Sequence, residues 1–170
     1  MEAERRLQEL GIELPPVGLP VASYVPVVRS GTLAFVAGQV AMEGGTPMWT
    51  GKLGADLDVE VGARAARRCA LQALAALRAD LGSLDRVERI LKVTVFVASA
   101  EGFTEQPKVA NGASDVLVDV FGEPGRHARA AVGVSELPLG GPVEVEVIAQ
   151  IRSRTASGRR GPRVAPGSAP

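Results

Sequence analysis

The densest group of chemically active side chains lies at residues 126–129, Arg-His-Ala-Arg, where a strand is predicted to begin. Side chains alternate along a strand, so His127 and Arg129 share one face. A turn at residues 137–142 predicts an antiparallel return that brings Glu144 onto the partner strand. Two interpretations are open there. Arg129 forms a plain ion pair with a glutamate, or its planar guanidinium binds a substrate carboxylate and leaves Glu144 free to handle water or a proton.

Several residue types on which enzymes depend are scarce, since the 170 residues contain one His, one Cys, one Trp and one Tyr. A metal site built on several His or Cys ligands is therefore impossible within one chain, and we expect neither a metal nor a cofactor. The hydroxyl of Tyr24 either reaches a cleft or caps the core. Trp49 forms either the rim of a pocket or a lid packed on the core. A lone histidine such as His127 is more often a hydrogen-bonded surface residue.

The elements that must position these side chains alternate between strand and helix patterns. An alanine-rich apolar stripe predicts a long helix that Asp56 or Asp58 caps and that ends at Gly82. The other predicted elements are a helix at 2–10, strands at 24–28 and 33–36 joined by a Ser30-Gly31 turn, a loop at 38–54, a strand at 91–98, a helix at 103–121, and strands at 128–134 and 144–151. This order favours an α/β (α+β) sheet with both long helices on one face. The opposite face, half apolar and half charged, predicts an oligomer.

Charge is unevenly distributed along the chain, although the total is balanced at 19 basic and 19 acidic side chains. The first 150 residues carry 14 basic and 19 acidic side chains, a net charge of −5, and the last twenty carry five arginines and no acid. We interpret residues 153–170 as a disordered, solvated basic tail, residues 1–17 as a helix with an extended segment, and 18–152 as the main domain. The acidic domain argues against nucleic acid as a partner. With no secretory signal and no membrane-spanning run, we expect a cytoplasmic protein.

Five short segments, taken in order, resemble the RidA/YjgF family, which is also labelled endoribonuclease L-PSP or reactive intermediate deaminase. The segments are Pro20-Val-Ala-Ser-Tyr24, Ser30-Gly31, Phe35-Val-Ala-Gly-Gln39, Lys92-Val-Thr-Val-Phe-Val97, and Ala128-Arg129 with the following Leu137-Pro138 and Glu144-Val-Glu146. The resemblance implies a chorismate-mutase-like fold with a mainly antiparallel or mixed sheet. It also implies a homotrimer, with the sheets forming an inner barrel and ligand clefts lying between subunits.

The same resemblance implies a reaction, the hydrolysis of reactive 2-imino or 2-enamino acids to 2-keto acids and ammonia. Arg129 stands at the position that binds the substrate carboxylate, Glu144 at that of the acidic residue, and Tyr24 at that of the aromatic hydroxyl. Two further residues at family positions are Gly31 and Asn111. Three departures concern the cleft. Ala131 stands where many members have a cysteine, Ala37-Gly38-Gln39 replaces Ser-Gly-Gln, and the long loop that carries Trp49 reshapes the cleft mouth.

Two alternatives accompany this hypothesis. The first is a trimeric binding or regulatory protein that holds a small carboxylate-bearing molecule, such as an imino or keto acid, without converting it. The second is RNA cleavage, which the older family label suggests. RNA cleavage conflicts with the net charge of −5 over the first 150 residues and with the absence of an RNA-reading motif.

Overall fold

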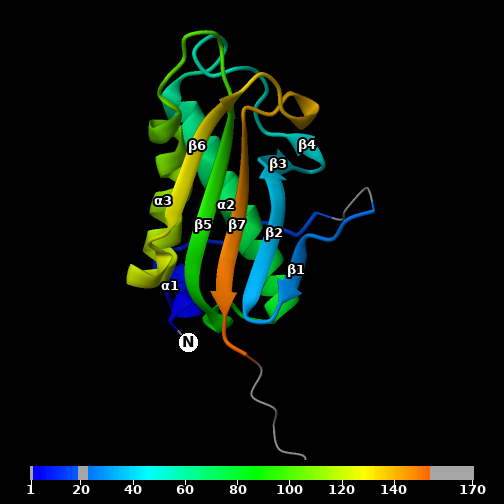
Figure 1. Ribbon diagram of the computed structural model, residues 1–170, viewed down its shortest axis with the longest axis vertical. Coiled ribbons are helices and arrows are strands. Elements are labelled where there is room, and N and C mark those ends of the chain that lie inside the picture. Colours follow the sequence, from blue (N-terminus) through cyan, green and yellow to red (C-terminus); the bar gives the residue numbers. More distant parts are fainter. Residues whose placement is uncertain (1, 19–22, 154–170) are drawn as a thin grey trace, which may run out of the picture.

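Seven strands form two sheets in the computed structural model, which describes residues 2–18 and 23–153. The strands are β1 (Val27–Ser30), β2 (Leu33–Val40), β3 (Met42–Glu43), β4 (Thr46–Pro47), β5 (Val87–Ala98), β6 (Ala128–Val134) and β7 (Val143–Ile151). The main sheet has the order β1-β2-β7-β5-β6, and β3 pairs with β4 in a small hairpin (Figure 1). Because β5 and β6 are parallel and the other neighbouring pairs are antiparallel, the main sheet is mixed, as predicted.

The longest helix, α2 (Val59–Leu81), has the ends that its sequence predicts. The Asp58 carboxylate accepts a hydrogen bond of 2.8 Å from the Val61 amide, and Gly82 ends the helix in the left-handed conformation at φ 83°. A side-chain cap of this kind contributes about 1 kcal/mol. The buried, alanine-rich face of α2 lies against β2 and β7, where small side chains allow close contact with the sheet.

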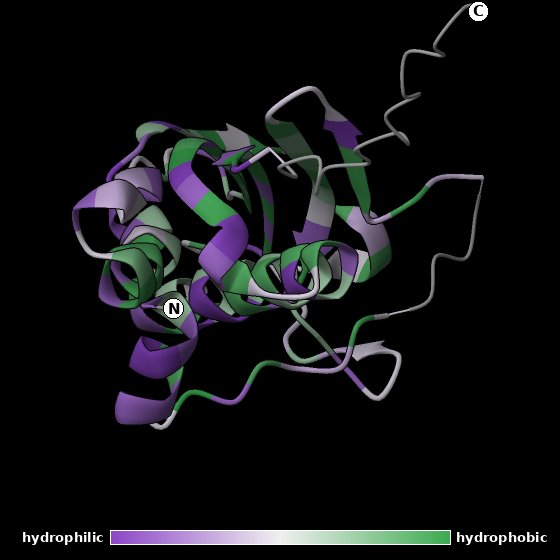
Figure 2. Ribbon diagram, turned by 90° about the horizontal axis from the view of Figure 1, so that it is seen from below, coloured by the Kyte–Doolittle hydropathy of each residue, from purple (hydrophilic) through white to green (hydrophobic). Residues whose placement is uncertain are grey.

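The helices α1 (Ala3–Glu9) and α3 (Gln106–Phe121) complete the layer on the same side of the sheet (Figure 2). No helix of the described residues lies on the other side. Gly112 allows α3 to approach α2, because a Cβ at this position would lie 1.9 Å from the carbonyl oxygen of Ala63. α3 connects β5 to β6, the edge strand. The helix that joins two parallel strands therefore lies beside the strand that carries Arg129.

The structure corrects three sequence predictions. β1 begins at Val27 rather than at residue 24, and the predicted loop at 38–54 contains the end of β2 and the β3–β4 hairpin. The third correction concerns β7, which pairs with β2 and β5 and is separated from β6 by β5. Since β6 occupies one side of β5 through the parallel α3 crossover, only the other side is open to β7. Glu144 is therefore not on the partner strand of Arg129.

The face of the sheet opposite the helices is half apolar and half charged, as the sequence predicts. Phe35 and Val132 expose 41% and 43% of their surface, and Glu146 is exposed between them. The strand register places the following side chains together on this open face: Val28, Phe35, Lys92, Thr94, Phe96, Val132, Glu144, Glu146 and Ile148. No described helix covers these side chains, which is typical of a surface that another subunit covers.

The predicted N-terminal and C-terminal segments can be compared with the structure only in part. Ala3 and Leu7 of α1 are buried in the main core, so this helix packs as part of the folded unit. The tail predicted at 153–170 lies outside the described residues except for Ser153. Within residues 2–18 and 23–153, no helix combines the length and the apolar character needed to cross a membrane.

Candidate functional site

Arg129 enters the site from β6, and α3 supplies the groups that hold it. Its Nη1 donates hydrogen bonds to Asn111 Oδ1 at 2.9 Å and to Ser114 Oγ at 3.0 Å, and its Nη2 donates to the Pro107 carbonyl at 3.3 Å. These three acceptors follow each other at steps of four and three residues, which places them on one face of the helix. The first turn and the middle of α3 therefore form a cradle for the guanidinium.

The cradle is electrically neutral, which leaves the charge of Arg129 available to a ligand. Within the described ranges Arg129 forms no ion pair, and its side chain is half-buried. An arginine has five N–H donors. Three are used by the acceptors in α3, so Nε–H and one hydrogen of Nη2 have no partner among the described residues. Donors on two neighbouring nitrogens can bind both oxygens of a carboxylate.

His127 contacts the same cradle through Ser114. The Nε2 atom lies 3.0 Å from Ser114 Oγ, and Nδ1 lies 2.6 Å from the Gly125 carbonyl oxygen in the 3₁₀ turn η2 (Glu123–Gly125). Burial lowers the pKa of His127, and the positive charge of Arg129 lowers it further, whereas the contact with Gly125 opposes both. The imidazole is therefore neutral near pH 7. The group that contacts His127 on its other side is the neutral Gly125 carbonyl, not the carboxylate of a catalytic triad, and Ser114 already accepts a hydrogen bond from Arg129. This geometry therefore orients the side chains and does not activate Ser114 as a nucleophile.

Glu144 lies across a bend in β2. The register between β2 and β7 shifts between Val36 and Gln39, and the Glu144 carboxylate rests against the backbone of Gly38 at this bulge. A Cβ at Gly38 would lie 1.8 Å from Glu144 Oε1, so only glycine leaves room for this position. Partial burial raises the pKa of Glu144, and the negative charge of Glu146 raises it further. A carboxyl group with a raised pKa can accept a proton and return it.

Arg129 and Glu144 are separated within one protomer. Arg129 is paired with Val93, which is paired with Val147, so the two residues differ by three positions along the strands and by two strands across the sheet. Standard strand dimensions then give a Cα–Cα separation of about 14 Å. The pairing also places Arg129 toward the helices and Glu144 on the open face. The ion pair that the sequence left open between these residues does not form within the chain.

The structure places Tyr24 and Gly31 at the opposite side of the sheet from Arg129. Tyr24 precedes β1, the far edge strand, and exposes 51% of its surface to solvent. Four strand spacings separate β1 from β6, a distance of roughly 19 Å. Gly31 forms the β1–β2 turn at φ 58° and lines a cavity of about 310 Å³ beside Arg86 and Arg152. One protomer therefore does not bring either residue to Arg129.

The remaining two predicted residues lie in different surroundings. Ala131 follows Arg129 on the same face of β6 and packs against the edge of the core. Trp49 is half-buried and packs against the core, with the Arg64 guanidinium 5.8 Å from its ring centroid. The contact with Arg64 of α2 fixes the loop after β4 on the helix layer.

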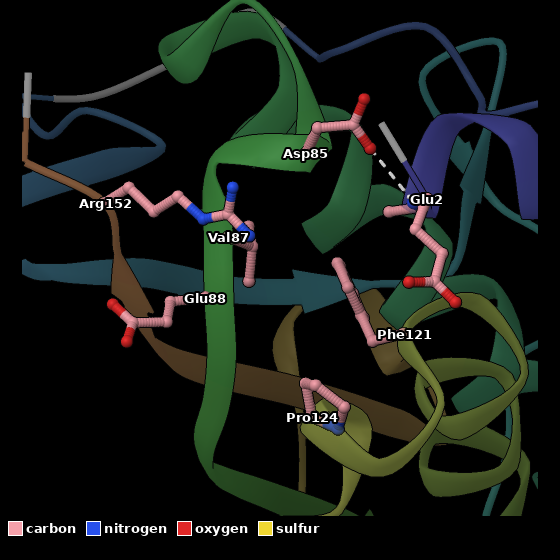
Figure 3. A pocket seen from close by; sticks show the side chains of 8 residues that line it. Glu2, Asp85, Val87, Glu88, Phe121, Pro124 and Arg152 are labelled. Carbon is pink, nitrogen blue, oxygen red and sulfur yellow. Dashed lines mark hydrogen bonds between the residues drawn. The ribbon is translucent and has the colours of Figure 1, made fainter.

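A second cavity, of about 90 Å³, lies between α1, α3, η1 (Leu84–Arg86) and the start of β5 (Figure 3). Phe121 and Pro124 form its apolar side, and Asp85, Glu88 and Arg152 contribute charges. The Asp85 carboxylate accepts a hydrogen bond from the Ala3 amide at 3.0 Å, so it joins α1 to η1. Neither cavity is lined by Arg129 or Glu144.

Sequence reasoning did not include three residues that the structure brings into contact with the candidate site. Ser114 and Pro107 share a face of α3 with Asn111, and their helical spacing was the available signal. Gly38 stands in the quoted Ala-Gly-Gln segment, but its contact with Glu144 joins two strands and has no local signature. Within residues 2–18 and 23–153, no group of three or more His, Cys, Asp or Glu side chains could hold a metal ion.

Known proteins resemble this chain in sequence and in fold. Residues 4–151 match the family described as "YjgF/chorismate_mutase-like, putative endoribonuclease". The chain belongs to the YjgF/RidA family. The match includes α1 except for Ala3 and every strand of the described residues, and it confirms the predicted family and its chorismate-mutase-like fold.

Three known proteins illustrate the similarity of this YjgF/RidA family chain in sequence and in fold. Protein TCP17 of Trypanosoma cruzi is 50% identical over 148 residues, which cover 86% of this chain and 92% of that protein. The crystal structure of Atu1372 from Agrobacterium tumefaciens, described as a protein with unknown function, is 46% identical with a TM-score of 0.81, covering 89% and 94% of the two chains. RidA from the Antarctic bacterium Psychrobacter sp. is 26% identical with a TM-score of 0.56, covering 79% and 94%.

Proposed function

We propose that this protein hydrolyses reactive 2-imino or 2-enamino acids to 2-keto acids and ammonia. One observation carries the proposal. Arg129 is half-buried, bound only by neutral acceptors, and retains two N–H donors on neighbouring nitrogens. This arrangement binds a small carboxylate, the group that these substrates share. We place the reaction in the cytoplasm.

The chemistry requires binding, a placed water and a proton relay. Arg129 binds the substrate carboxylate, and Asn111 holds the guanidinium in place. Glu144 takes a proton from water as the oxygen attacks the imine carbon, and it passes this proton to the nitrogen. It then takes the proton of the new hydroxyl group and passes it to the nitrogen as the carbon–nitrogen bond breaks. Water supplies the keto oxygen, and ammonia carries away the nitrogen. Because an imine is already electrophilic, no covalent nucleophile is needed.

The site is completed by a second subunit, and we propose a homotrimer. Arg129 and Asn111 lie at the β6 edge, whereas Tyr24 lies at the β1 edge of the same sheet. A closed ring built from one head-to-tail contact brings opposite edges of neighbouring subunits together. The open apolar face with Phe35 and Val132 then becomes the inner surface, and the clefts that bind small carboxylates lie between subunits.

The decisive experiment measures 2-keto acid and ammonia release from a 2-imino acid that an amino-acid oxidase generates in the assay. The parent should exceed the spontaneous rate, and Arg129→Ala should fall close to it. Arg126→Ala is the matched control, because Arg126 is exposed and pairs with Glu123 at 2.9 Å outside the cradle. Equal rates for the parent and Arg129→Ala would falsify the proposal.

A second function, binding without conversion, is favoured by the location of the Arg129 cradle. All three acceptors belong to the same protomer as Arg129, so the carboxylate site does not depend on Glu144. A binding or regulatory protein would be stabilised by 2-oxobutanoate in a thermal-shift measurement. It would also leave imine hydrolysis at the spontaneous rate.

A further inference from the structure

The contact between Ser114 and His127 has a defined hydrogen-bond direction. The Gly125 carbonyl can only accept, so Nδ1 of His127 carries the hydrogen in their 2.6 Å contact. In a neutral imidazole, Nε2 is then an acceptor. Ser114 must donate its single hydroxyl hydrogen to Nε2 at 3.0 Å, and its oxygen is left to accept from Arg129 Nη1, also at 3.0 Å.

We propose that Ser114 and His127 are positioning residues for Arg129, and that proton binding at His127 is linked to carboxylate binding at Arg129. The chain of contacts runs from Gly125 through His127 and Ser114 to the guanidinium. Each donor in this chain meets an acceptor only when the imidazole is neutral. The inference rests on the proposed function, because it concerns how the same site holds its carboxylate.

Protonation of His127 changes the contact with Ser114 in two ways. Nε2 becomes a donor, so the Ser114 oxygen receives two donors and its own hydrogen loses the imidazole as its acceptor. A second positive charge also comes close to Arg129. Burial and the charge of Arg129 lower the pKa of His127 in the empty site. A carboxylate bound to Arg129 would offset that charge and favour the imidazolium.

Arg129 is the charged group that acts on the imidazole. The surrounding elements carry other charged side chains: Glu123 of η2 and Arg126 after it, Lys108, Asp115 and Asp119 of α3, and Glu88, Arg89 and Lys92 of β5. Lys108, Asp119, Glu88 and Arg89 are exposed. Arg126 and Glu123 neutralise each other in an exposed ion pair, and Asp115 is also exposed. Lys92 is paired in register with Ala128, on the face of the sheet away from α3. Ligand occupancy at Arg129 therefore has the largest effect on His127.

The direction in which pH changes the carboxylate affinity of Arg129 follows from this arrangement. If bound carboxylate raises the pKa of His127, then carboxylate affinity must increase as the pH falls through that range. We expect 2-oxobutanoate to bind roughly 5- to 10-fold more tightly at pH 5.5 than at pH 8, the usual size of such coupling. The glutamine in His127→Gln can still accept the Ser114 hydrogen but cannot titrate. This variant should bind 2-oxobutanoate with little pH dependence.

The experiment uses the chain's single histidine, whose NMR signals need no assignment among others. Nitrogen-15 spectra of the full chain should show the Nδ1–H form of His127, and 2-oxobutanoate should raise its pKa. Ser114→Ala removes one of the acceptors that hold Arg129 and should weaken 2-oxobutanoate binding, and Ser114→Thr, which keeps a hydroxyl, should restore it. The Nε2–H form, or an unchanged pKa in the parent at saturating 2-oxobutanoate, would overturn the linkage.

A ligand-free measurement separates this inference from the proposed function. Arg129→Gln removes the positive charge beside the imidazole, so the pKa of His127 should rise without any added carboxylate. An unchanged pKa in Arg129→Gln would overturn the electrostatic effect of Arg129 on His127. If both pKa effects occur but imines are not hydrolysed faster than in buffer, the positioning role stands and the proposed catalysis fails.

Discussion

Replacing Gly38 with alanine tests the position of Glu144 with little change elsewhere. The new Cβ would lie 1.8 Å from Oε1 and 2.8 Å from Cδ of Glu144. An ordinary contact needs about 3.5 Å, so the carboxylate must move by roughly 1.5 Å. The atoms in conflict are the end of a flexible side chain, and the stability cost should stay below about 1 kcal/mol. A displacement near 1 Å in a reacting group, however, can reduce the rate about 100-fold.

The assay compares kcat/KM for imine hydrolysis with the melting temperature. Gly38→Ala should lower kcat/KM about 100-fold and leave the melting temperature within about 3 °C of the parent. Gly44→Ala is the matched control, because Gly44 has a positive φ of 56° but nothing within 4 Å of an added Cβ. Strain there should lower the melting temperature by about 2–4 °C without affecting kcat/KM. Parental kcat/KM in Gly38→Ala would refute the placement of Glu144 in the reaction.

Three further predictions concern stability, pH and assembly. Asp58→Ala removes the cap of α2 and should cost about 1 kcal/mol, measured by calorimetry, whereas Asp58→Asn should retain most of it. Since the folded state raises the pKa of Glu144, the charged carboxyl opposes folding at neutral pH, and protonation relieves that effect as the pH falls. Glu144→Gln should therefore abolish hydrolysis yet melt at a higher temperature than the parent at pH 7, with the difference vanishing below about pH 4. Phe35→Glu places a charge on the open face and should convert the oligomer to monomer in sedimentation velocity, whereas a parent that is already monomeric contradicts the proposed trimer.

Local sequence signals predicted the individual elements well. The cap at Asp58 and the stop at Gly82 define α2 because both act within one turn of the helix. The strand predicted at 128–134 is β6 without change at either end. These features depend on neighbours in the chain, and periodicity and turn chemistry report on such neighbours.

Contacts between distant segments were harder to predict. The position of β7 between β2 and β5 depends on how strands pair, and the turn before β7 is compatible with either neighbour. The need for glycine at position 38 comes from its contact with Glu144 on another strand, so the residues around Gly38 do not predict it. Nothing in the sequence distinguishes Ser114 from other polar residues on a helix, because its contacts come from Arg129 of β6 and from His127 just before that strand. Strand alternation and the following turn pointed to Arg129 and Glu144, and the family resemblance added Asn111, but neither predicted that Pro107 and Ser114 also hold the arginine.

The division of the site between opposite faces of one sheet has a genetic consequence. In the proposed ring, each cleft takes Arg129 from one subunit and Glu144 from its neighbour. A chain that carries Arg129→Ala and a chain that carries Glu144→Gln are each inactive alone, yet mixed trimers contain clefts with both native side chains. Random assembly of equal amounts restores about one cleft in four. Two defective alleles expressed together would therefore complement each other.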